Sequence, residues 1–266
     1  MSDDQKKQLE EFESRIDQFH PGHSIDCVIL GYHDRHLKIL LLKWKHEELW
    51  SLPGGFVYTH ESLEDAAYRV LKERTGLGSI FLSQFHTFGD VGRQRAPSAP
   101  QAVMMENLYQ KLPLKDPVRF RSWIQQRFIT TGYFALVDFA KTEPRPDFLG
   151  ERCEWIDLQQ LPELLMDHDA IIKKALAQLR IQLNYLPVGL SLLPEKFTIQ
   201  DLQKVYEAIL QKKLDRSNFQ RKILKLGFLN RHEKQMTGAA NKAPFLYSFD
   251  ERNYKELLTS GIGFSM

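Results

Sequence analysis

The chain has 266 residues, of which 42% are hydrophobic and 26% charged, proportions that are normal for a globular protein with a hydrophobic core. Its two cysteines, Cys27 and Cys153, lie far apart and in no CxxC spacing, so neither a disulfide framework nor a zinc site is expected. The charged N-terminus lacks the apolar segment of a signal peptide, and apolar runs such as Ile39–Leu42 are too short to span a bilayer. We therefore expect a cytoplasmic protein without a membrane partner.

The overall net charge of +2 indicates no particular partner, but the charge is unevenly distributed. Residues 187–266 contain 13 Lys and Arg against 8 Asp and Glu, a net charge of +5, which leaves −3 for the first 186 residues. A basic C-terminal third on an acidic body is typical of a nucleic-acid-binding module. Ordinary scatter of surface charge is the alternative explanation.

The first part of the chain predicts several strands and one amphipathic helix. Residues 1–20 are a charged helix or tail. Apolar, β-prone runs predict strands at residues 24–30, 37–43 and 50–52. A capping-box pattern at Ser62 and Asp65 predicts the start of a helix, which Gly76 ends.

The middle of the chain is less regular. Residues 97–125 contain four prolines among charged and aromatic side chains, and we interpret them as an insertion with a short helix near 117–126. Residues 127–137 and 153–156 predict further strands. The apolar stripe of residues 168–182 predicts an amphipathic helix, and a linker follows at 184–189.

Beyond this linker the pattern changes to a helix–turn–helix followed by a hairpin. Thr198, with Asp201 three residues later, caps one helix. Asp215 begins a second helix, which Gly227 ends. Two strands, at residues 228–229 and 245–249, then enclose a polar loop.

A longer motif lies between the short strand at Trp50 and the end of the first helix. The residues at the diagnostic spacings are Gly55, Glu61, Arg69, Glu73, Gly76 and Leu77. They resemble the Nudix box, in which Gly and five residues precede Glu, and seven more precede Arg-Glu-U-x-Glu-Glu-x-Gly-U, where U is apolar. The motif follows a strand and opens a helix, as the Nudix fold requires.

Two of the three metal-site glutamates of the Nudix helix are missing. Nudix enzymes cleave a diphosphate bound through Mg²⁺, a hard cation that prefers oxygen ligands. The three glutamate positions are occupied here by Val70, Glu73 and Arg74. Val70 can neither bind a metal nor accept a proton, and Arg74 places a permanent cation beside the expected ion. We therefore expect no catalytic residue, no metal site and no cofactor, Mg²⁺ being relevant only to residual hydrolysis.

The cleft remains a candidate ligand site, although an empty scaffold is the alternative. The Arg74 guanidinium can bind phosphate in place of the metal charge, and glycine backbone N–H groups can approach an anion. Trp50 can stack on a base or sugar, or fill the core. Arg93 lies on a loop that covers the cleft or is merely solvated. The candidate ligand-binding residues are Trp50, Gly54, Gly55, Glu61, Arg69, Glu73, Arg74 and Arg93.

The helix after Asp215 is a candidate DNA-recognition helix. Phe219, Ile223 and Leu226 recur at i, i+4 and i+7, so its polar residues must point outward. In a major groove, Arg can read guanine, Asn and Gln can read adenine, and Lys can hold phosphates. The basic loop between the last two strands predicts a wing. The candidate DNA-binding residues are Thr198, Arg216, Ser217, Asn218, Gln220, Arg221, Lys222, Lys225 and Lys242.

The order of these segments along the chain closely resembles that in the Nudix-related transcriptional regulators. This family includes the NAD-biosynthesis repressors (NrtR) and the arabinose-responsive regulators. The degenerate box, Asp167-His168 and the segments at 193–198, 202–210 and 214–224 carry the resemblance. It implies an α/β (α+β) protein with a Nudix α/β/α sandwich around a mixed sheet as effector-binding domain at 21–183, and a winged helix-turn-helix at 190–266. The segment at 97–125 departs from the pattern.

The resemblance also implies a homodimer on palindromic operator DNA. ADP-ribose or a related nucleotide is the effector in one branch, and a pentose sugar, L-arabinose, in the other. We therefore predict a ligand-responsive transcriptional regulator that is not an enzyme. One alternative is a Nudix hydrolase acting on a nucleoside-diphosphate derivative such as ADP-ribose, with a C-terminal region that only dimerises. Another is a module that binds protein or RNA.

Overall fold

The computed structural model describes residues 1–46, 48–78, 81–93, 99–183, 192–235 and 243–260. These residues form two compact units. The first comprises residues 1–30, 38–135 and 140–175, and the second comprises residues 31–37, 136–139 and 176–266, as far as they are described. Within the described ranges, no helix combines the length and the apolar character needed to cross a membrane.

A seven-stranded sheet is the centre of the first unit. Its main path runs in the order β3-β2-β1-β6-β5, with β4 paired to β1 and β7 paired to β2. The strands are β1 (Phe19–His33), β2 (His36–Trp44), β3 (Trp50–Ser51), β4 (Gly54–Tyr58), β5 (Leu82–Phe88), β6 (Ile129–Leu136) and β7 (Gly150–Asp157). Runs of consecutive buried residues, such as 39–42 in β2, mark strands that are covered on both faces.

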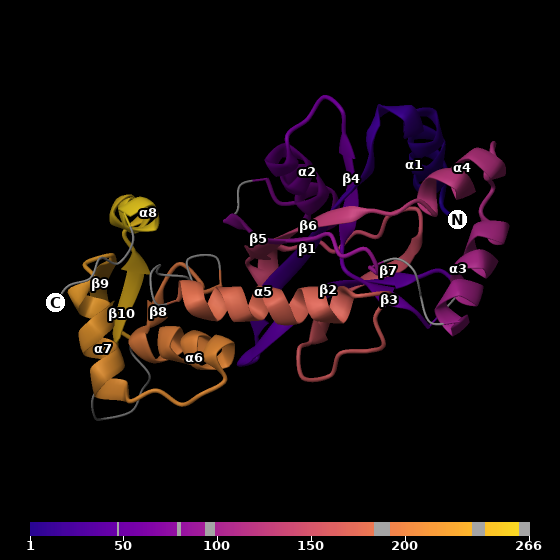
Figure 1. Ribbon diagram of the computed structural model, residues 1–266. Helices are drawn as coiled ribbons and strands as arrows, with labels where there is room; N and C mark the ends of the chain where they lie inside the picture. The colour runs from indigo at the N-terminus through magenta and orange to yellow at the C-terminus, as the bar shows by residue number, and fades with distance from the viewer. Residues whose placement is uncertain (47, 79–80, 94–98, 184–191, 236–242, 261–266) are drawn as a thin grey trace. The chain divides into compact units, whose positions relative to one another are not determined.

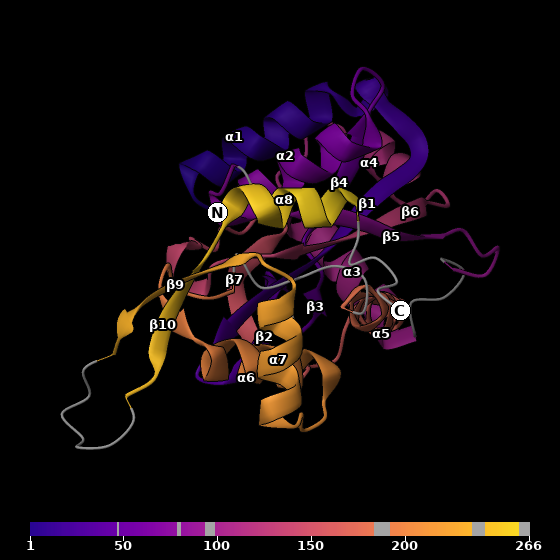
Figure 2. The ribbon, with the colours of Figure 1, turned by 90° about the vertical axis from the view of Figure 1, so that its left-hand side faces the viewer.

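Helices lie on both sides of this sheet. α2 (Leu63–Thr75) and the first half of α5 (His168–Gln182) lie on opposite faces of it, which gives three layers (Figure 1 and Figure 2). Ser62 caps α2 in a capping box with Asp65, and Gly76 ends the helix in the left-handed conformation at φ 72°. The predicted α/β/α sandwich is confirmed.

The described part of the segment at 97–125, residues 99–125, contains two helices that pack on the N-terminal helix. α3 (Ala99–Lys111) was not expected, whereas α4 (Pro117–Ile124) confirms the short helix predicted near 117–126. The N-terminal residues form α1 (Asp3–Ser14), followed by the 3-10 turn η1 (Ile16–Gln18). Leu9 of α1, Tyr109 of α3 and Phe120 of α4 share one buried apolar cluster.

The second unit contains a helix pair and a small sheet. It comprises β8 (Phe197–Thr198), α6 (Ile199–Leu210), α7 (Arg216–Lys225), β9 (Leu229–Lys234), β10 (Phe245–Phe249) and α8 (Glu251–Ser260). A 3-10 turn, η2 (Phe139–Lys141), begins in this unit. The strands pair in the order β8-β10-β9. Aromatic contacts join Phe197 to Phe249 and Tyr206 to Phe219. Two helices followed by a β-hairpin confirm the predicted winged helix.

Candidate functional site

Glu61 and Arg69 fasten the Nudix loop to the Nudix helix. Arg69 donates from Nη2 to Glu61 Oε1 at 2.6 Å and to the carbonyl of Phe56 at 2.8 Å. Glu61 also accepts the backbone N–H of Tyr58 at 2.9 Å. Arg69 Nε donates to the other oxygen, Oε2, so Glu61 is bonded to both the helix and the loop, and this carboxylate holds the shape of the motif.

Val70, the first substituted glutamate position, lies under the loop. Its side chain is fully buried. A Cβ added to Gly55 would lie 2.7 Å from Val70 Cγ2, and one added to Gly54 would lie 2.9 Å from Asp26 Oδ1. The two glycines are therefore required for close packing, and position 70 belongs to the core beneath the cleft.

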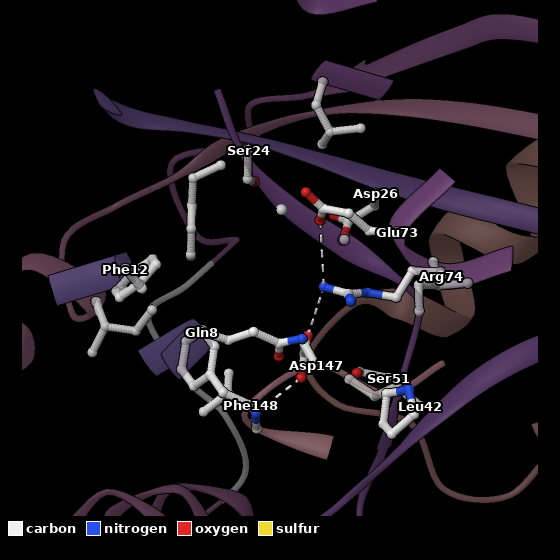
Figure 3. A pocket seen from close by; sticks show the side chains of 18 of the residues that line it. Gln8, Phe12, Ser24, Asp26, Leu42, Ser51, Glu73, Arg74, Asp147 and Phe148 are labelled. Atoms are coloured by element: carbon white, nitrogen blue, oxygen red, sulfur yellow. Dashed lines mark hydrogen bonds and ion pairs between the residues drawn. The ribbon is translucent and has the colours of Figure 1, made fainter. Parts of the chain in front are cut away.

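Arg74, the second substituted position, lies in the cleft. Arg74 is 8% exposed. Figure 3 shows its guanidinium between two carboxylates, with Nη2 at 3.2 Å from Asp147 Oδ2 and 3.9 Å from Glu73 Oε2. Its Nε is buried and has no hydrogen-bond partner among the described residues. Arg74 therefore faces the cleft with one donor unused.

A second buried network lies around Asp26 on β1. Arg93, whose side chain is 4% exposed, pairs with Asp26 Oδ2 at 3.3 Å and with Asp167 Oδ2 at 2.7 Å. His168 accepts the backbone N–H of Leu52 on Nδ1 at 2.9 Å, and its Nε2 lies 3.8 Å from Asp26 Oδ1. Burial lowers the pKa of His168, although Asp26 and Asp167 partly oppose this shift. The alternative of a solvated Arg93 is wrong.

Arg74 and Asp147, together with Asp26, Arg93 and His168, line a cavity of about 860 Å³ in the first unit. Among its lining residues are six candidates: Gly54, Gly55, Arg69, Glu73, Arg74 and Arg93. Glu61 and Trp50 are not among them. Trp50 is 9% exposed, so its position favours the core-filling alternative over stacking on a ligand.

The cavity has a charged part and an aromatic part. The charged part contains five arginines and five carboxylates: Arg15, Arg69, Arg74, Arg93, Arg145, Asp4, Glu11, Asp26, Glu73 and Asp147. The aromatic part contains Phe12, Phe19, Phe56, Tyr109, Phe128 and Phe148. Polar atoms without a described partner, Gln8 Oε1 and Gln126 Nε2, belong to lining residues as well. A cavity of this kind suits a ligand that combines a planar apolar group with negative charge.

The residues of the Nudix helix do not fit the Mg²⁺ ion of Nudix enzymes. Of the three glutamate positions, only Glu73 carries a carboxylate, and this carboxylate lies 3.5 Å from Arg69 Nη1. No group of three or more His, Cys, Asp or Glu in the described ranges is arranged to hold a metal ion. The donor set consists of arginines paired with carboxylates, which is a poor match for a hard cation.

Several lining residues were missed because they come from remote segments. α1 contributes Gln8 and Phe12, and the segment before β7 contributes Asp147 and Phe148. Asp26 had a recognisable signal, since a carboxylate inside an apolar strand requires a partner when it is buried. The others had none in the sequence.

Most of the candidate DNA-binding residues lie on the exposed surface of α7. Asp215 caps this helix, and Phe219 and Ile223 are buried beneath it. The exposed residues are Arg216, Ser217, Asn218, Gln220, Arg221, Lys222 and Lys225. Thr198 differs, because it is buried and caps α6 in a capping box with Asp201. Lys242 lies outside the described residues.

The hairpin after α7 supplies further basic groups. Arg231 and Lys234 on β9 are exposed, and the guanidinium of Arg231 lies 3.5 Å from the ring centroid of Phe245 on β10. A helix with a basic outer face, followed by a basic hairpin, is the arrangement by which winged helices contact DNA. The fold and the site thus define a Nudix domain joined to a DNA-binding winged helix.

Comparison with known proteins agrees with this class. The chain belongs to the NUDIX domain family, whose model matches residues 20–179. Residues 189–249 match the model of the NrtR DNA-binding winged helix domain.

Individual relatives are similar to this chain over most of its length or over a part of it. The chain is 29% identical over 242 residues to the ADPR responsive transcriptional repressor NtrR of Acinetobacter baylyi, covering 88% of this chain and 84% of that protein. It is 28% identical over 157 residues to an ADP-ribose pyrophosphatase of Methanocaldococcus jannaschii, covering 58% and 72%. The crystal structure of Shewanella oneidensis NrtR is 25% identical, with a TM-score of 0.66 and coverage of 88% and 96%.

Proposed function

We propose that this chain is a DNA-binding transcriptional repressor whose Nudix domain binds ADP-ribose or a closely related nucleotide. The observation that carries the proposal is the exposed basic face of α7, on a winged helix joined to a Nudix domain. The repressor of Acinetobacter baylyi, which is similar over most of both chains, supports it. As winged helix-turn-helix regulators commonly do, the protein would bind a palindromic operator as a homodimer.

α7 would enter the major groove of the operator. Its seven exposed polar residues include Arg216 and Arg221, and its apolar residues Phe219 and Ile223 face inward. Arginine donates two hydrogen bonds to guanine, and lysine neutralises phosphates. The buried cap Thr198 would keep α6 in place and is no longer proposed to contact bases.

A salt titration tests the DNA-binding proposal. The probe is duplex DNA from upstream of the protein's own gene, and the readout is fluorescence anisotropy. Replacing Arg216 and Arg221 with Ala removes two cations from each subunit, four from the proposed homodimer, so the slope of log K against log salt should become less steep by about 4 if all four lie near phosphates. Replacing Lys6 and Lys7 of α1, both exposed, is the matched control and should leave the slope unchanged. An unchanged slope in the α7 variant would contradict the assignment.

The cavity favours a nucleotide effector over a pentose. Its volume of about 860 Å³ is near the upper end of the roughly 300–1,000 Å³ range typical of pockets for drug-sized ligands. A single pentose is much smaller and has no aromatic ring to use Phe12, Phe56 and Phe148. A purine nucleotide with a diphosphate would occupy both the aromatic and the charged part.

Thermal unfolding with added ligand tests the effector proposal. A ligand that binds only the folded state raises the melting temperature. ADP-ribose should raise it, and L-arabinose at the same concentration should not. ADP-ribose should also change the affinity for operator DNA in the anisotropy assay. Stabilisation by the pentose alone would reverse this preference.

We further propose that the Nudix domain binds its nucleotide without hydrolysing it. The supporting observation is that Val70 and Arg74 replace two of the three metal-site carboxylates. The similarity to an archaeal ADP-ribose pyrophosphatase favours hydrolysis as the second candidate. Incubation with ADP-ribose and Mg²⁺ distinguishes the two, because turnover that Glu73→Gln abolishes would make the chain a hydrolase.

A further inference from the structure

Arg74 carries a charge opposite to that of the glutamate it replaces, and it lies inside the cavity. It is almost fully buried. Its Nη2 has two acidic neighbours, Asp147 at 3.2 Å and Glu73 at 3.9 Å. Its Nε has no hydrogen-bond partner among the described residues. A buried N–H without an acceptor is unfavourable, so an acceptor arriving in the cavity would be strongly favoured.

Asp147 keeps the guanidinium in position. Its Oδ1 accepts the backbone N–H groups of Leu149 and Gly150, both at 2.9 Å, while its Oδ2 faces Arg74. Its carbonyl accepts from Gln5 of α1 at 3.2 Å. Because three groups hold Asp147, the carboxylate stays with Nη2 and leaves the Nε donor of Arg74 to a ligand.

We propose that Arg74 binds a phosphate group of the effector directly, so that effector binding requires no divalent cation. This inference rests on the proposed function, and it names the group that recognises the effector's phosphate. A guanidinium donates two parallel hydrogen bonds to phosphate and remains charged at all physiological pH values. Arg69 and Arg93 line the same cavity, and the unpartnered Nε2 of Gln126 supplies a further donor.

Calorimetry of the whole chain, without any substitution, tests whether effector binding requires a divalent cation. Two probes, ADP-ribose and inorganic pyrophosphate, are each titrated in EDTA and in Mg²⁺. Both should bind in EDTA, with Kd values within about threefold of those in Mg²⁺ after correction for the complexes that Mg²⁺ forms with the free ligands. Binding that disappears in EDTA and returns with Mg²⁺ would overturn the inference and leave the proposed effector intact.

Substitutions of Arg74 test whether this residue is the one that binds the phosphate. Arg74→Ala should weaken both probes about 10- to 100-fold, since it removes charge-assisted hydrogen bonds. Arg74→Lys keeps the charge and should recover part of the affinity, because ammonium cannot bind phosphate bidentately. The control is Arg152→Ala, which removes a half-exposed arginine paired with Glu154 outside the cavity and should have no effect. Wild-type affinity in a folded Arg74→Ala variant would exclude Arg74.

Charge reversal gives a second, independent readout. Arg74→Glu places a third carboxylate beside Glu73 and Asp147, a donor set that suits a hard cation. This variant should lose pyrophosphate binding in EDTA and regain it with Mn²⁺ or Mg²⁺.

The wild-type titrations separate this inference from the effector proposal. If wild-type protein binds pyrophosphate but not ADP-ribose in EDTA, the effector proposal fails and the inference stands. If neither probe binds under any condition, both are wrong.

Discussion

Arg69 donates two hydrogen bonds to the Glu61 carboxylate, from Nε to Oε2 at 3.1 Å and from Nη2 to Oε1 at 2.6 Å. Outside the three metal-site positions, the Nudix box contains two charged residues, and both are present here as Glu61 and Arg69. Their pairing connects the loop after β4 to the middle of α2, and the guanidinium also lies 4.6 Å from the ring centroid of Tyr58. The box therefore keeps its architecture although it has lost metal-site carboxylates.

The first prediction concerns the stability of this pair. Glu61→Ala should lower the free energy of unfolding by about 2 kcal/mol, because it removes the carboxylate that pairs with Arg69 and leaves the Tyr58 N–H without its acceptor in a largely buried place. Urea unfolding followed by circular dichroism measures the change. Glu154→Ala removes the partner of the half-exposed Arg152 and should cost under about 1 kcal/mol. Equal effects of the two substitutions would refute the structural role of Glu61.

The second prediction concerns the aromatic part of the cavity. Phe148 lies 5.2 Å from Phe12 between ring centroids and is partly exposed. Phe148→Ala should weaken ADP-ribose binding about 5- to 150-fold, because base–aromatic stacking contributes about 1–3 kcal/mol. Binding of inorganic pyrophosphate, which has no base, should be unchanged. Calorimetry with both ligands measures the difference, and Tyr68→Ala, outside the cavity, is the control. Equal losses for both ligands would argue against a base-binding role.

Most regular elements of the fold could be predicted from local patterns. The helix expected at 168–182 matches α5 at both ends, because its apolar stripe and its burial coincide. α3 was missed because Pro100 was interpreted as a breaker, although proline is tolerated in the first turn of a helix. β4 was missed because its two glycines have low strand propensity, yet Gly54 and Gly55 pair with Asp26 and Ile25 of β1.

The site could be predicted only where the motif is contiguous. Arg69, Glu73 and Arg74 lie within one helix, so their spacing places them on one cleft. Asp147 and Phe12 are far from that helix in the chain and reach the cavity through tertiary packing. No local pattern encodes such packing. The same limit explains Trp50, for which the sequence left stacking and core packing equally open.

The third prediction concerns the two thiols. Burial raises the pKa of Cys153 to about 12 and raises that of the fully buried Cys27 further. The thiolate is the reactive form, so neither cysteine should react with iodoacetamide in the native protein at pH 8. In urea both should be alkylated, as intact mass spectrometry would show. Fast labelling of either thiol in the native protein would mean that its strand opens locally.

The fourth prediction is a pH dependence of stability through His168. Its folded-state pKa is lowered by burial, so the unfolded chain takes up a proton near pH 6.5 while the folded protein does not. The contribution of the neutral imidazole to stability is complete above pH 6.5 and is lost as the pH falls toward the folded pKa. His23 is lowered as well, also by burial, so the total profile is not due to His168 alone.

A comparison of variants isolates the histidine. The free energy of unfolding is measured in urea between pH 8 and pH 5 for the wild type, for His168→Gln and for His86→Gln, which removes an exposed histidine on β5. Glutamine keeps an acceptor for the Leu52 N–H but does not titrate. The wild type and His86→Gln should lose stability below pH 6.5 with parallel profiles, by at most about 1.4 kcal/mol per pH unit for each group. The His168→Gln profile should be flatter, and a slope equal to that of the wild type would show that His168 is protonated in the folded protein.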